Sequence, residues 1–242
     1  MSLPRPYYEH AGITIYHGDC REILPHVAAD VCITDPPYNA QTHENARSNR
    51  FKPGAAQAVR FIDFPPLTEE EFLEVMGLAG RAVRRWVVAT VAWQHGALLE
   101  QRTPEGLRFV RLGAWVKPAP MPQLTGDRPG QGWEAVAVLH RDGAPMRWNG
   151  GGKCAVFHQP QTNVRALWPT EKPLSLVSEF VSLFSDPGET VLDPCCGSGT
   201  TLVASKELGR RAIGIDVEER ACEIAAKRLA QEVLFPASQK EP

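Results

Sequence analysis

The feature that most constrains the fold is a strand-turn-helix-strand unit in the last quarter of the sequence. An apolar run over Thr190–Asp193 leads into a glycine-containing turn at 196–201, a helical stretch to Leu208, and a second apolar run over Ala212–Asp216. Glycines at such a turn let a ligand approach the backbone at the start of a helix, and an acid that ends the next strand can bind ribose hydroxyls. The unit therefore predicts an α/β fold with half of a nucleoside-cofactor site.

The spacing of this turn argues against a dinucleotide. A dinucleotide fingerprint needs a third glycine, and Leu202 stands at that position. Asp193 ends the first strand just before the glycines, which suits a cationic amino-acid moiety better than a pyrophosphate. The cofactor is therefore expected to carry both a ribose and a positive charge.

Two earlier apolar runs also end at polar residues. Ile13–His17 stops at Gly18-Asp19, and Asp30–Thr34 runs into Asp35-Pro36-Pro37-Tyr38. A parallel sheet presents the carboxyl ends of its strands at one edge, where ligands of α/β proteins bind. Asp19 and Asp35 are therefore candidates for the same site as Asp193.

The tetrapeptide Asp35–Tyr38 is the sharpest chemical signal in the chain. Two prolines fix the direction of the backbone carbonyls, the carboxylate accepts a hydrogen bond, and the tyrosine ring offers a stacking surface. This set fits a planar amine, with Asp35 and the Pro36 carbonyl accepting its two protons and Tyr38 stacking on its ring. The structural alternative is a turn that ends a strand and carries a capping aspartate.

Capping and periodicity predict the other elements. Thr68-Glu69-Glu70-Glu71 is a capping box for a helix that reaches about Arg85, and Pro173 suits the first turn of a buried helix. The remaining expected elements are the strands Trp86–Val91, Leu112–Lys117 and Glu134–His140, and a final amphipathic helix with Cys222, Ala225 and Leu229 on one face. Residues 39–66 and 143–169 show no periodicity and are expected to be irregular.

The order of these motifs resembles the beta class of DNA amino-methyltransferases, in which an Asp-Pro-Pro-Tyr motif precedes the glycine-rich cofactor motif. The segments Thr170–Pro173, Trp115–Lys117 and Trp133-Glu134 match this family as well. The resemblance implies a doubly wound, mostly parallel seven-stranded sheet with an antiparallel edge hairpin, in a single methyltransferase domain over 1–242. It also implies transfer of a methyl group from S-adenosyl-L-methionine to N6 of adenine in DNA. The alternative base position is N4 of cytosine; an aspartate rather than a serine at the start of the motif favours adenine.

The resemblance assigns roles to particular residues. The catalytic set is Asp35, Pro36, Pro37 and Tyr38. The expected cofactor contacts are Asp19, Cys20, Asp35, Lys172, Asp193, Pro194, Cys195, Gly197, Ser198, Gly199, Thr200, Thr201, Asp216 and Val217. For Asp19 and Asp216 the alternative role is helix capping, and for Lys172 it is a surface charge. Cys195-Cys196 and Asp216 depart from residues frequent in the family, and no metal site is expected.

The charge balance gives no overall sign of a nucleic-acid partner. The net charge is -2 and the sequence pI is about 6.4, so any phosphate contacts must be local. Arg47 and Arg50 in the stretch 39–66, and Arg147 and Lys153 in the stretch 141–169, are the candidates for such contacts in two target-recognition loops. A solvated charged face is the alternative reading of both stretches.

Two other functional classes remain open at this stage, an amine or amide methyltransferase acting on RNA or protein and a DNA-binding regulator that has lost catalysis. The chain shows no secretory leader and no apolar run of the roughly 18 residues that span a bilayer. A cytoplasmic protein without a membrane partner is therefore expected. The expected partner is double-stranded DNA, and the family also includes homodimers and enzymes paired with a cognate restriction enzyme.

Overall fold

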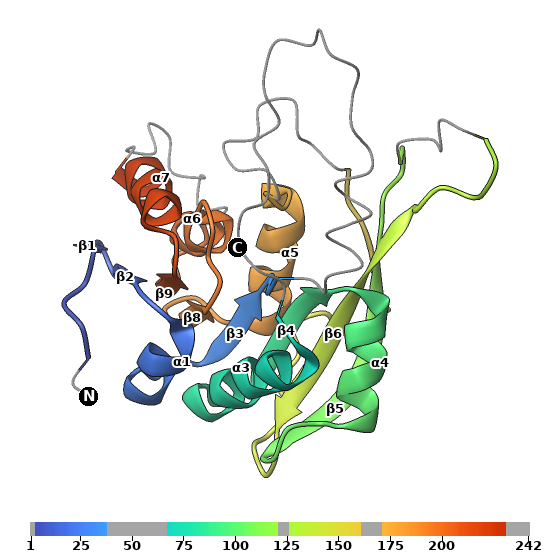
Figure 1. The fold of residues 1–242 in the computed structure, drawn as a ribbon, viewed down its shortest axis with the longest axis horizontal. Helices are drawn as coiled ribbons and strands as arrows, with labels where there is room; N and C mark the ends of the chain where they lie inside the picture. Colours follow the sequence, from blue (N-terminus) through green and yellow to red (C-terminus); the bar gives the residue numbers. More distant parts are fainter. Residues whose placement is uncertain (1–2, 38–66, 121–125, 161–170, 231–242) are drawn as a thin grey trace, which may run out of the picture.

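The computed structural model describes residues 3–37, 67–120, 126–160 and 171–230. Their strands form one sheet of nine strands in the order β1-β2-β9-β8-β3-β4-β6-β5-β7 (Figure 1). In chain order these strands are β1 Tyr8–His10, β2 Ile13–His17, β3 Val31–Thr34, β4 Trp86–Val91, β5 Leu107–Val116, β6 Trp133–Arg141, β7 Val156–His158, β8 Thr190–Asp193 and β9 Arg211–Asp216. The helices are α1 Cys20–Ile23, α3 Glu69–Ala82, α4 Trp93–Gln101, α5 Leu174–Phe184, α6 Thr200–Glu207 and α7 Glu219–Ala230, with a short 3-10 turn at Leu24–His26.

The expected mostly parallel sheet is confirmed. Strands β2, β9, β8, β3 and β4 run parallel to one another, and β6 pairs antiparallel with both β4 and β5. The seven longer strands make the expected sheet, and two strands of three residues, β1 and β7, extend it to nine. The antiparallel hairpin β5-β6 is therefore covered at its outer edge by β7, which the sequence analysis missed.

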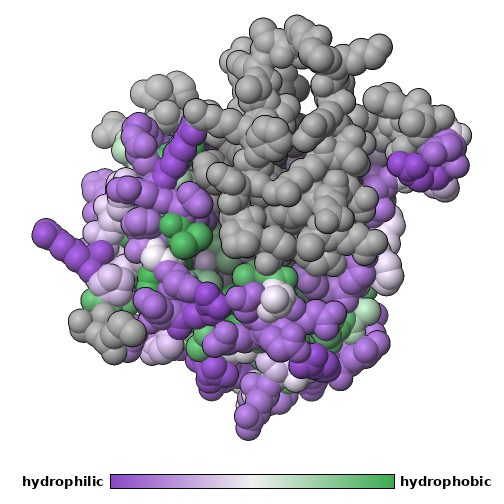
Figure 2. Space-filling model, in the orientation of Figure 1, coloured by the Kyte–Doolittle hydropathy of each residue, from purple (hydrophilic) through white to green (hydrophobic). Residues whose placement is uncertain are grey.

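Helices cover both faces of this sheet, as the doubly wound arrangement requires. On one face α3 and α4 bury Phe72, Met76 and Leu99 against the central strands. On the other face α5 buries Phe180 among others, while α6 and α7 pack over β2 and β9. Figure 1 shows the two groups of helices on opposite sides of the sheet. In Figure 2 hydrophilic residues predominate over the described part of the visible face, with apolar residues in smaller patches.

Local differences from the sequence-based elements have identifiable causes. The capping box at Thr68 is present, but α3 ends at Ala82 rather than near Arg85. Val83 then bridges to Ala29, and the backbone N–H of Arg85 binds the carbonyl of Asp30, so the chain joins the sheet three residues early. None of the helices in the described ranges is both long and apolar enough to cross a membrane.

The strand order creates a switch point between β8 and β3. From β8 the chain passes through α6 to β9 on one side, whereas from β3 it continues to β4 on the other side. Connections that leave neighbouring strands in opposite directions open a crevice at the carboxyl ends of those strands. Asp193 ends β8 and Asp35 follows β3, so the fold brings both acids to this crevice.

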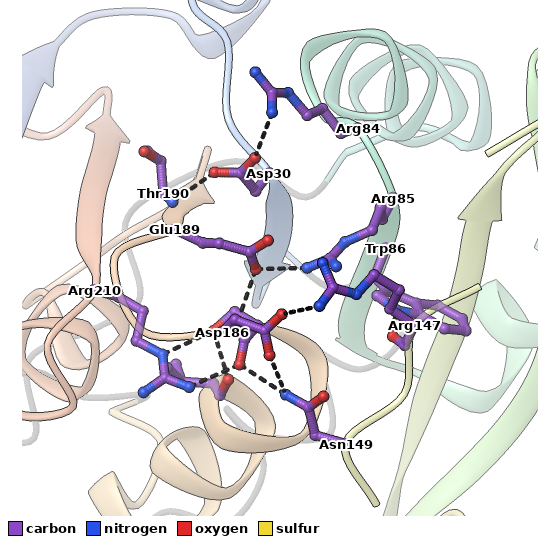
Figure 3. Close-up of polar contacts among 12 residues, drawn as sticks. Asp30, Arg84, Arg85, Trp86, Arg147, Asn149, Asp186, Glu189, Thr190 and Arg210 are labelled. Atoms are coloured by element: carbon purple, nitrogen blue, oxygen red, sulfur yellow. Dashed lines mark hydrogen bonds and ion pairs between the residues drawn. The ribbon is translucent and has the colours of Figure 1, made fainter. Parts of the chain in front are cut away.

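A polar network joins the segments at the opposite end of these strands (Figure 3). The guanidinium of Arg85, just before β4, lies 2.5 Å from a carboxylate oxygen of Glu189, just before β8, and both side chains are largely buried. Asp186 forms an ion pair of 3.0 Å with Arg147 and accepts a hydrogen bond of 2.9 Å from Asn149. These contacts tie the loop after β6 to the amino end of the sheet.

Candidate functional site

The carboxylate of Asp35 is held from two sides. Its Oδ1 accepts a hydrogen bond of 2.5 Å from the hydroxyl of Thr90, a buried residue of β4. Its Oδ2 accepts a hydrogen bond of 2.6 Å from the ammonium group of Lys172, two residues before α5. Because both donors belong to packed segments, the orientation of the carboxylate is fixed before any ligand binds.

Two more charges extend this contact away from Asp35. The ammonium group of Lys172 lies 3.6 Å from Oε2 of Glu134, and Oε1 of Glu134 accepts a hydrogen bond of 2.7 Å from Lys117. Burial by itself would lower the pKa of Lys172, but Asp35 and Glu134 outweigh burial and raise this pKa above its ordinary value. Lys172 therefore stays protonated and positively charged beside Asp35.

The rest of the Asp-Pro-Pro-Tyr motif is only partly described. Pro36 is buried and Pro37 is half-buried, directly after the acid. Tyr38 lies outside the described residues, so its predicted stacking role stays a prediction.

The second acid of the crevice, Asp193, is almost fully buried, with 3% of its surface exposed. Burial raises the pKa of its carboxyl to about 7, although the neighbouring Thr201, Thr34 and backbone N–H of Cys195 act in the opposite direction. The N–H of Cys195 donates to Oδ1 at 3.1 Å. A carboxyl group in this state gains from a nearby cation, because the cation favours the ionised form that burial disfavours.

The glycine loop between β8 and α6 has the backbone of a ligand cradle. Gly197 and Gly199 have φ values of 50° and 81°, which side chains other than glycine rarely adopt. A Cβ atom added to Gly199 would also lie 2.8 Å from the Cβ of Ala225 in α7. Thr200 then opens α6, an eight-residue helix, so its first backbone N–H groups face the loop.

Asp216 and Arg228 hold this loop in place. Asp216 accepts from the N–H of Gly197 at 2.7 Å and from the N–H of Glu218 at 2.9 Å, and its burial raises the pKa of the carboxyl. Arg228 donates to the carbonyl and hydroxyl of Ser198 at 2.9 and 3.0 Å and pairs with Glu171 at 3.1 Å. Arg228 therefore links the glycine loop to the segment that carries Lys172.

Two of the predicted cofactor contacts, Asp19 and Val217, take structural roles in this conformation. Asp19 caps α1 by accepting from the N–H of Arg21 at 2.9 Å, and its carboxylate pairs with the Arg21 guanidinium at 2.6 Å. This contact lowers the pKa of Asp19. Val217 is 62% exposed just beyond β9, and its carbonyl accepts a hydrogen bond of 3.1 Å from His17. For Asp19 the capping alternative is thus present, and a cofactor contact stays a prediction.

Two of the predicted DNA-binding residues, Arg147 and Lys153, lie in the described part of the chain. Arg147 pairs with Asp186, and its carbonyl accepts from the indole N–H of Trp86, the first residue of β4, at the opposite end of the sheet (Figure 3). Lys153 pairs with Glu179 on α5. Arg47 and Arg50 lie outside the described residues. The structure therefore places Arg147 at the end of the sheet opposite Asp35, and the DNA-binding roles stay predictions.

Sequence reasoning missed Thr90, Arg228 and the pairing of Lys117 with Glu134. Thr90 had a weak signal, as a polar residue near the end of an otherwise apolar strand. The pairing of Lys117 with Glu134 depends on the antiparallel register of β5 and β6, in which Trp115 lies opposite Glu134. Arg228 stands among the charged residues of an amphipathic helix, and its sequence position gives no signal of a role.

Comparison with known proteins gives the family of this chain. The family model described as DNA methylase, for the N6 and N4 enzymes, matches residues 29–227. The type II methyltransferase M2.DpnII of Streptococcus pneumoniae is 26% identical over 95% of this chain and 94% of its own length.

Two solved structures share the fold of this chain. That of the M1.HpyAVI complex with SAM has a TM-score of 0.67 and 26% identity, and covers 90% of this chain and 100% of its own. The PvuII cytosine-N4-specific DNA methyltransferase shares the fold, with a TM-score of 0.72 over 96% of this chain and 91% of its own, at 14% identity. Since the family model spans most of the sequence, including Asp35, the glycine loop and Asp216, the chain belongs to the N6/N4 DNA methylase family.

Proposed function

We infer that this protein transfers a methyl group from S-adenosylmethionine to N6 of adenine in DNA. The observation that carries the inference is the convergence of Asp35 and Asp193 at one crevice, beside the glycine loop. Asp35 supplies a fixed acceptor for an amine, and Asp193 with the loop supplies a place for a cationic nucleoside. The complex of the relative M1.HpyAVI with SAM supports the choice of cofactor.

The residues of the crevice fit this cofactor. Asp193 is buried with a raised pKa, so the ammonium group of a methionine moiety would stabilise its ionised form. The left-handed backbone of Gly197 and Gly199 shapes the loop, and the first N–H groups of α6 suit a carboxylate. Asp216 ends β9 beside the loop, where its remaining lone pairs could accept from ribose hydroxyls.

The protein's part in the reaction is to position the amine. When bound, S-adenosylmethionine supplies an electrophilic methyl group on a sulfonium centre. Asp35 and the Pro36 carbonyl would accept hydrogen bonds from the two amine protons, which favours a pyramidal nitrogen with an available lone pair. Transfer to this nitrogen would break the methyl–sulfur bond and release a neutral thioether, and one of the amine protons would pass to the Asp35 carboxylate.

The base must leave the DNA stack to reach Asp35, at a cost of roughly a few kcal/mol. Two large aromatic residues at the same edge of the sheet suit contact with DNA. Trp93 follows β4 and is 56% exposed, and Trp133 opens β6 and is 39% exposed. Exposed rings of this kind can stack on bases. Arg47, Arg50 and Lys153 stay part of the proposed DNA surface, whereas Arg147, at the opposite end of the sheet, does not.

Adenine is preferred to cytosine because an aspartate opens the motif. N4 of cytosine is the second candidate, and the PvuII enzyme shows that this fold serves a cytosine-N4-specific methyltransferase. The intact acceptor at Asp35 and the intact glycine loop favour an enzyme over an inactive DNA-binding regulator. A cognate restriction enzyme and a homodimer remain proposals, supported by the type II methyltransferases among the relatives.

Sequencing of DNA from cells that express the protein tests the function, the base and the recognition site together. We expect N6-methyladenine at one recurring sequence in cells with the intact chain, and none in matched cells that carry the empty vector. N4-methylcytosine in its place would overturn the adenine assignment. Unmodified DNA in cells that contain the folded protein would count against the proposed function.

A further inference from the structure

Four charged side chains alternate in sign along the edge of the sheet next to the crevice. They are Asp35 after β3, Lys172 before α5, Glu134 in β6 and Lys117 after β5. The N···O distances along the row are 2.6, 3.6 and 2.7 Å, and the four side chains are between 10% and 26% exposed. Such a row is a single electrostatic unit, because each inner charge has an opposite charge on both sides.

The two inner members have no role in the reaction as proposed so far. Lys172 was expected to contact the cofactor. In the structure its ammonium group lies 2.6 Å from Asp35 and 3.6 Å from Glu134. Glu134 lies between two ammonium groups, those of Lys172 and Lys117. Replacement of Lys172 by a neutral residue would take this cation away from Asp35, whereas replacement of Glu134 would remove one of the carboxylates that Lys172 faces.

We propose that Lys172 and Glu134 are positioning residues for methyl transfer, and this rests on the proposed function of Asp35. Lys172 holds the Asp35 carboxylate in one orientation, with Oδ2 fixed by Lys172 and Oδ1 fixed by Thr90. Glu134 shares the Lys172 charge, so that Asp35 keeps enough electron density to accept hydrogen bonds from the target amine. Both residues act through Asp35.

The proposal predicts losses of transfer rate without a matching loss of cofactor affinity. Lys172→Met removes the cation that fixes Oδ2 of Asp35, so its rate at pH 7 should fall about 100-fold, the usual cost of a misplaced catalytic group. Glu134→Gln removes the second carboxylate beside Lys172, so its rate should fall about tenfold.

The measurement is single-turnover transfer of a labelled methyl group to duplex DNA between pH 5 and 9, with cofactor affinity measured separately by calorimetry. Lys172→Arg should recover the rate to within about tenfold of the intact protein, because it restores the cation. Lys227→Met is the matched control, since Lys227 pairs with Glu223 on the exposed face of α7. This control should leave the rate, the pH profile and the affinity unchanged.

Each outcome separates this inference from the proposed function. An intact protein without methyl transfer to DNA would overturn the proposed function itself. An active intact protein whose Lys172→Met variant keeps its rate, or is not rescued by Lys172→Arg, would overturn the inference alone. If Lys172→Met loses cofactor affinity in proportion to its rate, Lys172 is a cofactor ligand and the inference is wrong. Should Lys172→Met fail to fold, Glu134→Gln and Lys172→Arg, which conserve shape or charge, decide the question.

Discussion

Asp35→Ala is expected to lower the rate of methyl transfer at least about 1000-fold while cofactor affinity stays within a few fold. The substitution removes an oriented anionic acceptor from the target amine, and groups of this kind contribute about 100-fold to 10,000-fold to catalysis. The cofactor should be spared because Asp193, the glycine loop and Asp216 come from other segments of the chain. Single-turnover kinetics and calorimetry on the same preparations measure the two quantities.

The fold should tolerate this substitution. Lys172 keeps Glu134 at 3.6 Å as a counter-ion when Asp35 is removed, so no buried charge is left alone. Thr90→Val is a useful companion because it removes one donor to Asp35 but leaves the carboxylate in place. We expect a loss of about tenfold for this variant. Full activity of Asp35→Ala would show that the carboxylate does not hold the amine.

Asp193→Asn is expected to stabilise the protein without cofactor and to abolish cofactor binding. In the folded chain burial raises the pKa of Asp193 to about 7, against an ordinary value of 3.8. An acid with a raised folded pKa costs stability once the pH exceeds that pKa, and about three pKa units correspond to about 4 kcal/mol. The neutral amide avoids this cost, and its oxygen can still accept from the N–H of Cys195.

The sign and the pH window of this effect are specific. The gain in free energy of unfolding should be complete above about pH 7, decrease as the pH falls, and vanish below about pH 3, where Asp193 is protonated in both states. Urea unfolding at pH 8 and pH 4.5 measures this decrease. Cofactor affinity of the intact protein should increase from pH 6 to 7.5, because the cation binds the ionised carboxyl. Equal stability of the two proteins at pH 8, or unchanged affinity in Asp193→Asn, would remove the assignment.

The central strands could be predicted from sequence because each is buried on both faces and reads as a continuous apolar run. β2, β4 and β8 were placed to the residue, and the capping box located the start of α3. The three-residue strands β1 and β7 are too short to show a period. Helix α4 was missed because its buried face includes Gly96 and His95, whose ring stacks on Phe72, rather than a run of large apolar residues.

Only the site residues that stand at the end of a buried strand could be predicted from the sequence. Asp35 and Asp193 each end a buried run, and parallel strands bring such ends together, so their convergence follows from the sequence. Contacts such as Thr90 with Asp35 depend on strand order, which residues 55 positions apart do not reveal. The composition of the stretch around Arg147 did not predict its position, because an irregular basic stretch carries no information about which end of the sheet it lies on.

Methyl transfer to N6 of adenine in DNA is tested most directly by the fate of a labelled methyl group. The purified protein is incubated with duplex DNA of mixed sequence and S-adenosylmethionine carrying a deuterated methyl, and the DNA is digested to nucleosides for mass spectrometry. We expect labelled N6-methyladenine with the intact protein and none with Asp35→Ala. Label confined to N4-methylcytosine would contradict the base assignment, and the absence of any labelled nucleoside would contradict the claim that this chain methylates DNA.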